Sequence, residues 1–254
     1  MGDICCGGAA ALSETWPIFR VGVIDSTNTE AKRRAVGSFA DQWIVADQQT
    51  AGRGRQDRTW LSPLGNVYAT ALFREPGGIT TALRGPFACA LAVSDVVREL
   101  APLADVRLKW PNDVRVDRRK VSGILVETGG TGQEFWVAAG IGINVRIVPD
   151  NVSQPATSLL ELGAAPSTSA ETAFLALVRA FDRRLAQCRQ GFAGTRADWL
   201  ERAEALGGAV QVRAGDSLIE GIFEDLEADG ALLLRLPDGS RRSIRAGEIE
   251  IRGS

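Results

Sequence analysis

The sequence predicts an α/β domain followed by a small all-β domain. Strand-like and helix-like apolar patterns alternate over residues 18–206, which is typical of an α/β domain. From residue 207 to residue 254 only short strand-like segments remain, separated by AGD, ADG and PDG turn signals. The chain has 254 residues, of which 45% are hydrophobic and 24% are charged. That length and composition suit one large globular domain and one small one.

The first part of the chain begins with a lead-in, residues 1–17, which lacks the basic start of a secretory signal. Residues 18–24 (IFRVGVI) then predict a strand. A helix follows, with Thr27 as its cap, Glu30 as the capping-box partner and Gly37 as the stop.

The middle of the chain alternates strands, a loop and a helix. Its expected strands are residues 43–46, 66–73, 106–110, 121–128, 134–140 and 141–145. Residues 47–60 are polar and punctuated by glycine, which predicts a loop. Residues 87–100 place apolar side chains along one side of a helix.

The last part of the chain predicts two helices and then strands. Residues 169–190 give the clearest helical spacing, and a shorter helix is expected over residues 198–205. The strand segments of the C-terminal domain are VQVR, LIEGIFEDL, ALLLRL and RSIRAGEIEI.

The composition excludes several function classes. The chain contains no histidine, so a Ser-His-Asp triad, a kinase HRD loop and a His-ligated zinc site are excluded. Its four cysteines form no CxxC pair, which indicates reduced thiols and a cytoplasmic location. The net charge of −2 gives no basis for DNA binding, and no segment approaches the ~20 apolar residues of a membrane span.

The motif GRGRQDR, residues 52–58, carries three arginines on a glycine-softened loop. The planar guanidinium group of arginine binds phosphate or carboxylate through several N–H donors in a fixed geometry. Glycine has no side chain, so backbone N–H groups beside it can approach a ligand closely. Like charges this close repel one another, so an anion would help to order them. The alternatives are a solvated basic loop and an RGG-like nucleic-acid segment.

Three further motifs carry polar groups at strand ends or glycines within strands. In KWPND, residues 109–113, an amide and a carboxylate follow a strand end, although Pro-Asn-Asp is more commonly an ordinary turn. Lys120 opens the strand of RRKVSGILVE, where a lone lysine is usually a surface residue. The glycines of GIGIN, residues 140–144, permit close approach of something flat, or mark a strand bend. Only three of the 29 basic residues are lysines: Lys32, Lys109 and Lys120. A lysine among so many arginines either occupies a position that requires a compact ammonium group or is there by chance.

The order and spacing of AGRGR, KWPND, KVSGILVE and GINV resemble those of biotin protein ligases. The resemblance runs from about Ser26 to Asn144, and the small C-terminal domain fits it too. It implies an α/β (α+β) catalytic domain with a mixed sheet, residues 18–206, and an SH3-like β-barrel, residues 207–254. About 20 residues precede the first strand, too few for the winged helix of some members, which indicates the monofunctional type.

The resemblance also implies the roles of individual residues. It assigns biotin binding to Ser26, Thr27, Asn28, Gln49, Arg53, Gly54, Arg55 and Lys120. It assigns catalysis to Lys120, Arg55 and Arg53. It assigns nucleotide binding to Arg55, Arg58, Trp60, Asn112, Asp113 and Asn144.

The implied reaction uses ATP, biotin and Mg²⁺, with Asp113 as the expected metal ligand. Its implied partner is the biotin carboxyl carrier protein of acetyl-CoA carboxylase, and a homodimer is left open. Two positions are compared with the family pattern. Asp57 stands in the loop where a small or basic residue is common, and its negative charge would weaken loop closure. Ser122 stands where alanine or serine is usual. Two rival functions are a lipoate ligase, whose usual motif includes a histidine, and an arginine-loop RNA-binding protein.

Overall fold

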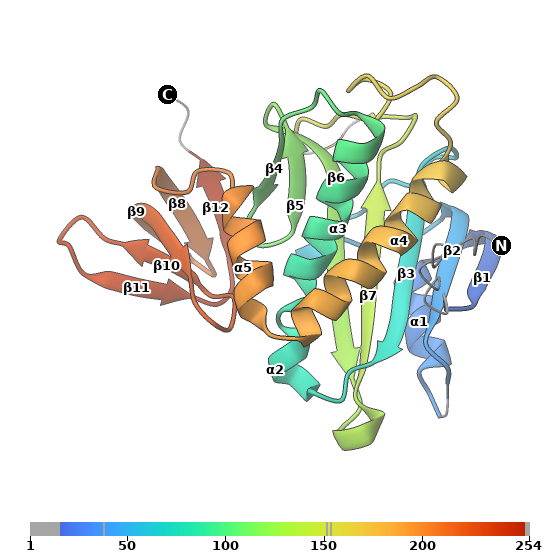
Figure 1. The fold of residues 1–254 in the computed structure, drawn as a ribbon, viewed down its shortest axis with the longest axis horizontal. Coiled ribbons are helices and arrows are strands. Elements are labelled where there is room, and N and C mark those ends of the chain that lie inside the picture. The colour runs from blue at the N-terminus through green and yellow to red at the C-terminus, as the bar shows by residue number, and fades with distance from the viewer. Residues whose placement is uncertain (1–15, 38, 151, 153, 252–254) are drawn as a thin grey trace, which may run out of the picture.

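The computed structural model describes residues 16–251 apart from residues 38, 151 and 153. In this range the chain forms a seven-stranded mixed sheet with helices on both faces, and a separate five-stranded antiparallel sheet at one side (Figure 1). The predicted fold class is therefore confirmed. None of the helices in this described range is long and apolar enough to cross a membrane.

The large sheet is antiparallel except at one edge, where β1 runs parallel to β2. Its strands, in spatial order, are β1 (Ile18–Ile24), β2 (Gln42–Gln49), β3 (Val67–Arg74), β7 (Trp136–Ile143), β6 (Arg119–Gly129), β5 (Asp113–Val116) and β4 (Val106–Lys109). The strands β4 and β5 form a hairpin, whose turn holds Pro111 and Asn112 of the PND segment, and Asp113 opens β5. The two segments expected over residues 134–140 and 141–145 form one continuous strand, β7, which contains both glycines of GIGIN.

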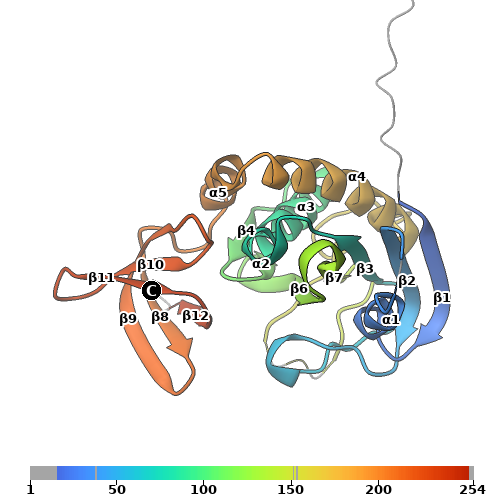
Figure 2. The ribbon, with the colours of Figure 1, turned by 90° about the horizontal axis from the view of Figure 1, so that it is seen from below.

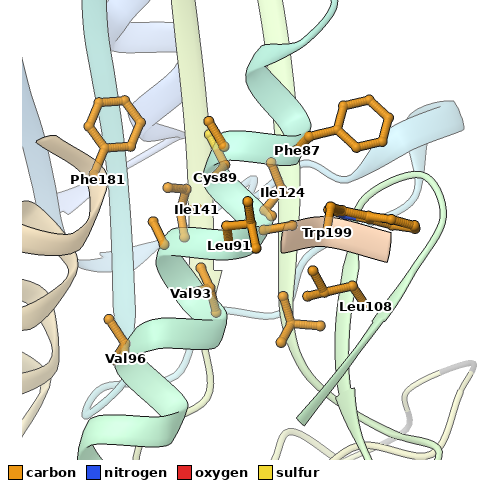
Figure 3. Packing of buried hydrophobic residues seen from close by; sticks show 14 of the residues in the cluster. Phe87, Cys89, Leu91, Val93, Val96, Leu108, Ile124, Ile141, Phe181 and Trp199 are labelled. Carbon is orange, nitrogen blue, oxygen red and sulfur yellow. The ribbon is translucent and has the colours of Figure 1, made fainter. Parts of the chain in front are cut away.

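Helices cover the two faces of this sheet unequally (Figure 2). The long helices α3 (Gly85–Leu100) and α4 (Ala170–Arg189) lie over one face, with the short helix α2 (Gly78–Ala82) leading into α3. The single helix α1 (Thr27–Arg34) packs on the other face. The helix α3 packs against the sheet on one side and against α4 on another. Its buried side chains therefore lie around most of the helix and do not form a single apolar stripe (Figure 3).

Local expectations failed where tertiary contacts overrode the local signal. Ser26, not Thr27, is the N-cap of α1, and it makes no side-chain cap bond. The helix ends at Arg34, three residues before the expected stop at Gly37. The strand β2 continues to Gln49, because its backbone pairs with β1 through Gln48 and Gln49. The helix expected over residues 198–205 is α5 (Phe192–Glu201), which begins earlier and ends earlier.

The lead-in expected over residues 1–17 falls mostly outside the described residues, as do Cys5 and Cys6. Trp16, the first described residue, packs against the hydrophobic core. The Trp16 ring lies 5.4 Å from the Phe73 ring and 5.9 Å from the Phe181 ring, measured between centroids. Trp16 therefore extends the core beneath α4.

The C-terminal sheet has five strands where four segments were expected. In spatial order they are β11 (Arg241–Ile244), β10 (Leu232–Arg235), β9 (Ser217–Leu226), β8 (Ala209–Ala214) and β12 (Glu248–Ile251). The last predicted segment divides into β11 and β12. The sheet is docked on the large domain by Trp110, whose Nε1 donates to the Gly230 carbonyl at 3.2 Å. This docking brings β12 toward the β4–β5 turn.

Candidate functional site

A cavity of about 920 Å³ opens between the large sheet and β12 of the C-terminal sheet. It is lined by the start of α1, the arginine loop (residues 52–58), the β4–β5 turn, the first half of β6, the second half of β7, several residues between 149 and 156, and β12. Every residue predicted for the site lines it: Ser26, Thr27, Asn28, Gln49, Arg53, Gly54, Arg55, Arg58, Trp60, Asn112, Asp113, Lys120 and Asn144. The structure thus joins motifs that lie far apart in the sequence.

One end of the cavity is built from neutral polar groups at the start of α1. The Gln49 amide oxygen accepts hydrogen bonds from the Thr27 backbone N–H at 2.8 Å and from the Thr27 hydroxyl at 3.2 Å. The Gln49 amide nitrogen donates to the Ser62 hydroxyl at 3.0 Å. We call this the neutral end, defined by Ser26, Thr27, Asn28 and Gln49; its polar groups are held in fixed directions.

Asn28 is the most constrained residue of the neutral end. Its amide nitrogen donates to the Leu125 carbonyl at 3.1 Å and to Glu127 at 3.0 Å, and its amide oxygen accepts from the Thr70 hydroxyl at 2.7 Å. A side chain at Gly140 would collide with the Asn28 oxygen, because a Cβ there would lie 2.2 Å from it. The glycine is needed for the close approach of Asn28 to β7.

The second glycine of GIGIN admits a flat group. A Cβ at Gly142 would lie 2.5 Å from the Trp60 indole, and one at Gly123 on β6 would lie 2.8 Å from the same ring. The indole ring therefore lies on a floor of two glycines in neighbouring strands, and the Lys120 ammonium is 5.4 Å from its centroid. β7 pairs with β3 and with β6 in an unbroken register through Gly140 and Gly142, so no register shift marks a bend at the GIGIN glycines.

The three arginines of the loop are each held by a partner elsewhere in the fold. Arg53 donates to the Glu127 carboxylate at 3.0 Å. Arg58 forms an ion pair with Glu248 on β12, and Arg55 donates to the Asn112 side-chain oxygen and to the Gly247 carbonyl, both at 3.2 Å. The anions expected to order the loop include two carboxylates of the protein itself, Glu127 and Glu248.

The other end of the cavity is charged, and we call it the charged end, defined by Arg55, Arg58, Lys109, Asp113, Lys120 and Glu248. The Lys120 ammonium lies 2.7 Å from the Asp113 carboxylate, which is 5% exposed. Lys120 is thus an ion-paired residue beside the cavity, not a solvated strand end. Burial lowers the pKa of Arg55, while the charges of Glu248 and Asp113 oppose that change.

Lys109 and Glu248 are charged-end residues that the sequence analysis did not assign to the site. Lys109 is 8% exposed, and burial lowers the pKa of its ammonium. Hydrogen bonding from Arg58 lowers the pKa of Glu248 to about 2, and the charges of Lys109 and Arg55 add to this. The scarcity of lysine was a signal for Lys109, but nothing local distinguishes Glu248, which lies 190 residues from Arg58.

Three buried side-chain atoms of cavity-lining residues have no hydrogen-bond partner within the part of the chain that the structure describes. One is the Arg115 Nε atom, whose guanidinium pairs with Glu204 through another nitrogen. The other two are the Trp60 indole nitrogen, a donor, and the Asn144 side-chain oxygen, an acceptor. A buried polar group without a partner costs free energy, so these last two atoms suit a ligand that supplies complementary groups. The Ser122 hydroxyl also lacks a described partner, but it is fully buried and does not line the cavity. The Asp57 side chain lies outside the described side chains.

Comparisons with known proteins agree with this geometry. Residues 21–144 match the biotin/lipoate A/B protein ligase family, and residues 205–252 match the biotin protein ligase C terminal domain. The chain is 41% identical to a biotin–[acetyl-CoA-carboxylase] ligase of Paracoccus denitrificans, covering 89% of this chain and 96% of that protein. It is 34% identical to the bifunctional ligase/repressor BirA of Escherichia coli, covering 91% of this chain and 73% of that protein.

Solved structures give the same result. The chain is similar to the biotin protein ligase of Aquifex aeolicus in complex with biotin and ATP, with a TM-score of 0.78 and 28% identity. The similarity covers 94% of this chain and 99% of that one, so it includes both sheets.

Proposed function

The chain belongs to the biotin/lipoate A/B protein ligase family, and from this membership we propose that the cavity is the active site of an ATP-dependent biotin ligase. The activity joins biotin to the carboxyl carrier protein of acetyl-CoA carboxylase in two steps, through biotinyl-5'-AMP. One observation carries the placement of the site. A neutral end and a charged end share one cavity, which suits a substrate with a neutral head and a charged tail.

In this proposal the neutral end binds the biotin ring system. The ureido group of biotin is uncharged and offers both N–H donors and a carbonyl acceptor. The neutral end offers the Thr27 hydroxyl and the side-chain amides of Asn28 and Gln49, which hydrogen bonds hold in fixed directions. These groups can therefore match the donors and acceptor of the ureido group without reorganising. The biotin carboxylate then points toward Lys120 and the arginine loop.

The charged end binds ATP. Arg55, Arg58, Lys109 and Lys120 supply the positive charge that the triphosphate requires. The Trp60 ring and the unpaired oxygen of Asn144 offer a stacking surface and an acceptor for the base. Asn112 holds Arg55 in place by accepting from it at 3.2 Å.

The chemistry needs no nucleophile or histidine base from the protein. The biotin carboxylate oxygen attacks the α-phosphorus of ATP, the bond to the β-phosphate breaks, and pyrophosphate leaves. The main barrier is repulsion between anions, which Lys120, Arg55 and Arg53 lower by position and charge. A lysine amine of the carrier protein then attacks the acyl carbon, AMP leaves, and an amide bond forms.

Magnesium fits this donor set as an ion carried by the nucleotide. The described residues contain no cluster of three acidic, histidine or cysteine ligands, so no dedicated cage is present among them. Mg²⁺ commonly takes one or two carboxylates plus phosphate oxygens and water, and Asp113 would supply the carboxylate. When bound, the ion neutralises phosphate charge.

We also propose that the catalytic domain spans residues 18–206 and the C-terminal domain residues 207–254. The C-terminal family match begins at residue 205, and α5 ends at Glu201. The free, buried thiols of Cys89 and Cys188 support a reducing, cytoplasmic location.

The decisive test is ATP–pyrophosphate exchange with the purified chain. We expect exchange that depends on biotin and on Mg²⁺, and biotinylation of the carrier protein when it is added. Exchange with lipoate but not biotin would mean that the substrate is wrong. Salt-dependent RNA binding with no exchange would favour the RNA-binding alternative.

A further inference from the structure

The outer half of β6 carries a carboxylate that links three elements of the site without lining the cavity. Glu127 accepts from Lys32 on α1 at 2.9 Å, from Arg53 of the arginine loop at 3.0 Å, and from Asn28 at 3.0 Å. Asn28 and Arg53 both line the cavity, whereas Glu127 does not. Any influence of Glu127 on a ligand would therefore pass through these two neighbours.

The two carboxylate oxygens of Glu127 have different partners, one at the neutral end and the other in the arginine loop and on α1. Its Oε2 atom accepts from the Asn28 amide nitrogen, which fixes the amide so that the Asn28 oxygen faces Thr70. Its Oε1 atom accepts from both Lys32 and Arg53. One carboxylate thus orients the neutral end and holds the first arginine of the loop.

The charge balance indicates that Glu127 is ionised when it does this. Burial alone would raise the pKa of Glu127, but hydrogen bonds from Lys32 and Asn28 and the charges of Lys32 and Arg53 lower it overall. The side chain is 21% exposed, so its pairs are less screened by solvent than most surface pairs. Lys32 and Arg53 both donate to the Oε1 atom, so the negative charge of Glu127 offsets the repulsion between these two cations.

The far end of the same loop is tied to the same helix by a separate chain of bonds. The Gln49 amide nitrogen donates to the Ser62 hydroxyl, and that hydroxyl donates to the Trp60 carbonyl at 3.0 Å. Gln49 is itself bonded to Thr27. Both ends of the arginine loop therefore meet the start of α1, one through Gln49 and the other through Glu127.

We propose that Glu127 is a positioning residue for the ligation reaction. It couples the biotin end to loop closure, by orienting Asn28 and holding Arg53 over the biotinyl-adenylate. This rests on the proposed function. The consequence is that Glu127 controls how long the enzyme retains its intermediate more than how fast the intermediate forms.

The test separates the two roles with two substitutions. Glu127→Gln keeps an oxygen that accepts from Asn28 but removes the charge that holds Arg53. We expect biotinyl-adenylate release to become about five- to twentyfold faster, with the biotin KM changed less than about twofold. Glu127→Ala removes both contacts, and we expect faster release together with a raised biotin KM. Release is measured by stopped-flow after single-turnover adenylation.

A double-mutant cycle and a matched control identify the route. With Arg53→Ala already present, Glu127→Gln should add little to the release rate, since its partner is gone. Glu99→Gln is the control, because Glu99 pairs with Arg179 at the same 3.0 Å on helices remote from the cavity. It should leave release unchanged. Lys32→Gln keeps the Arg53–Glu127 bond, so it should also leave release nearly unchanged.

Three results would overturn the proposal. They are unchanged release in Glu127→Gln, full additivity with Arg53→Ala, or an equal effect of Lys32→Gln. Failure of the proposed function would look different, because the unsubstituted chain would then form no adenylate from biotin and ATP.

Discussion

The two ends of the cavity are built on different principles. At the neutral end, Thr27 and Gln49 satisfy one another through short bonds within the large domain. At the charged end, Arg55 and Arg58 depend on groups of the C-terminal sheet, the Gly247 carbonyl and the Glu248 carboxylate. Neutral hydrogen bonds can be completed among neighbouring elements, but a cluster of cations needs opposite charge brought from elsewhere.

The difference shows what each domain contributes. The large domain alone provides a fixed pattern for a neutral head group. The C-terminal sheet completes the charged end, where β12 supplies the carboxylate that balances the loop. We therefore expect changes at the charged end to alter ATP use and retention of the intermediate, and changes at the neutral end to alter biotin affinity.

The largest expected effect comes from Lys120→Ala. We expect adenylate formation to fall by about a hundred- to a thousandfold, because the ammonium opposes the charge that develops at the phosphate. A lysine at a strand end would ordinarily cost little stability, but here Asp113 loses a partner 2.7 Å away. Unfolding in denaturant should show a loss of about 1–3 kcal/mol. Adding Asp113→Asn should recover stability but not pyrophosphate exchange; recovery of both would remove Lys120 from the chemistry.

The next effect separates formation of the intermediate from its retention. Arg55→Gly removes the hydrogen bonds to Asn112 and to the Gly247 carbonyl. It also removes the guanidinium group that would donate hydrogen bonds to the adenylate. A charge-assisted bond is worth about 1.5–3 kcal/mol, so escape should be about ten- to a hundredfold faster. Freed biotinyl-adenylate would acylate lysines of a bystander protein, detected by probing for biotin. Labelling confined to the carrier would show that Arg55 does not retain the intermediate.

A smaller effect is expected at the neutral end. Thr27→Val removes the hydroxyl bond to Gln49 and keeps the side-chain volume. A loss of about 1 kcal/mol should raise the biotin KM about fivefold and leave the ATP KM unchanged. Thr172→Val, at the start of α4, is the control. A change in the ATP KM of equal size would remove the distinction between the two ends.

The smallest effect is expected at the contact between domains. Glu248→Gln should raise the ATP KM about two- to threefold and lower stability by about 1–2 kcal/mol at neutral pH. The folded pKa of Glu248 is about 2, below its ordinary 4.5, so its stabilisation is complete above pH 4.5 and is lost as the pH falls toward 2. Denaturant unfolding at pH 6, 4 and 3 should therefore show a shrinking difference from the unsubstituted protein. A constant difference would mean that the charge of Glu248 does not stabilise the fold.

Much of the fold was predictable because its signals are local. The apolar spacing of residues 169–190 matches α4 to within one residue at each end, and Ser169 caps it by accepting from the Thr172 backbone N–H. The edges of elements were less predictable. The helix α5 starts at Phe192, where the Phe87 ring lies 5.4 Å from it, so packing overrode a weak local pattern.

The sequence by itself determined the order of the elements, the absence of histidine chemistry, and the motifs that supply amides, arginines and Lys120. These follow from residue type and short-range spacing, which survive any arrangement in space. Only the tertiary structure decided which carboxylate faces which arginine. Glu127 lies 74 residues from Arg53, and Glu248 lies 190 residues from Arg58, so no local pattern links them. Electrostatic partners are chosen by distance in space, and that distance is set when the sheets pack together.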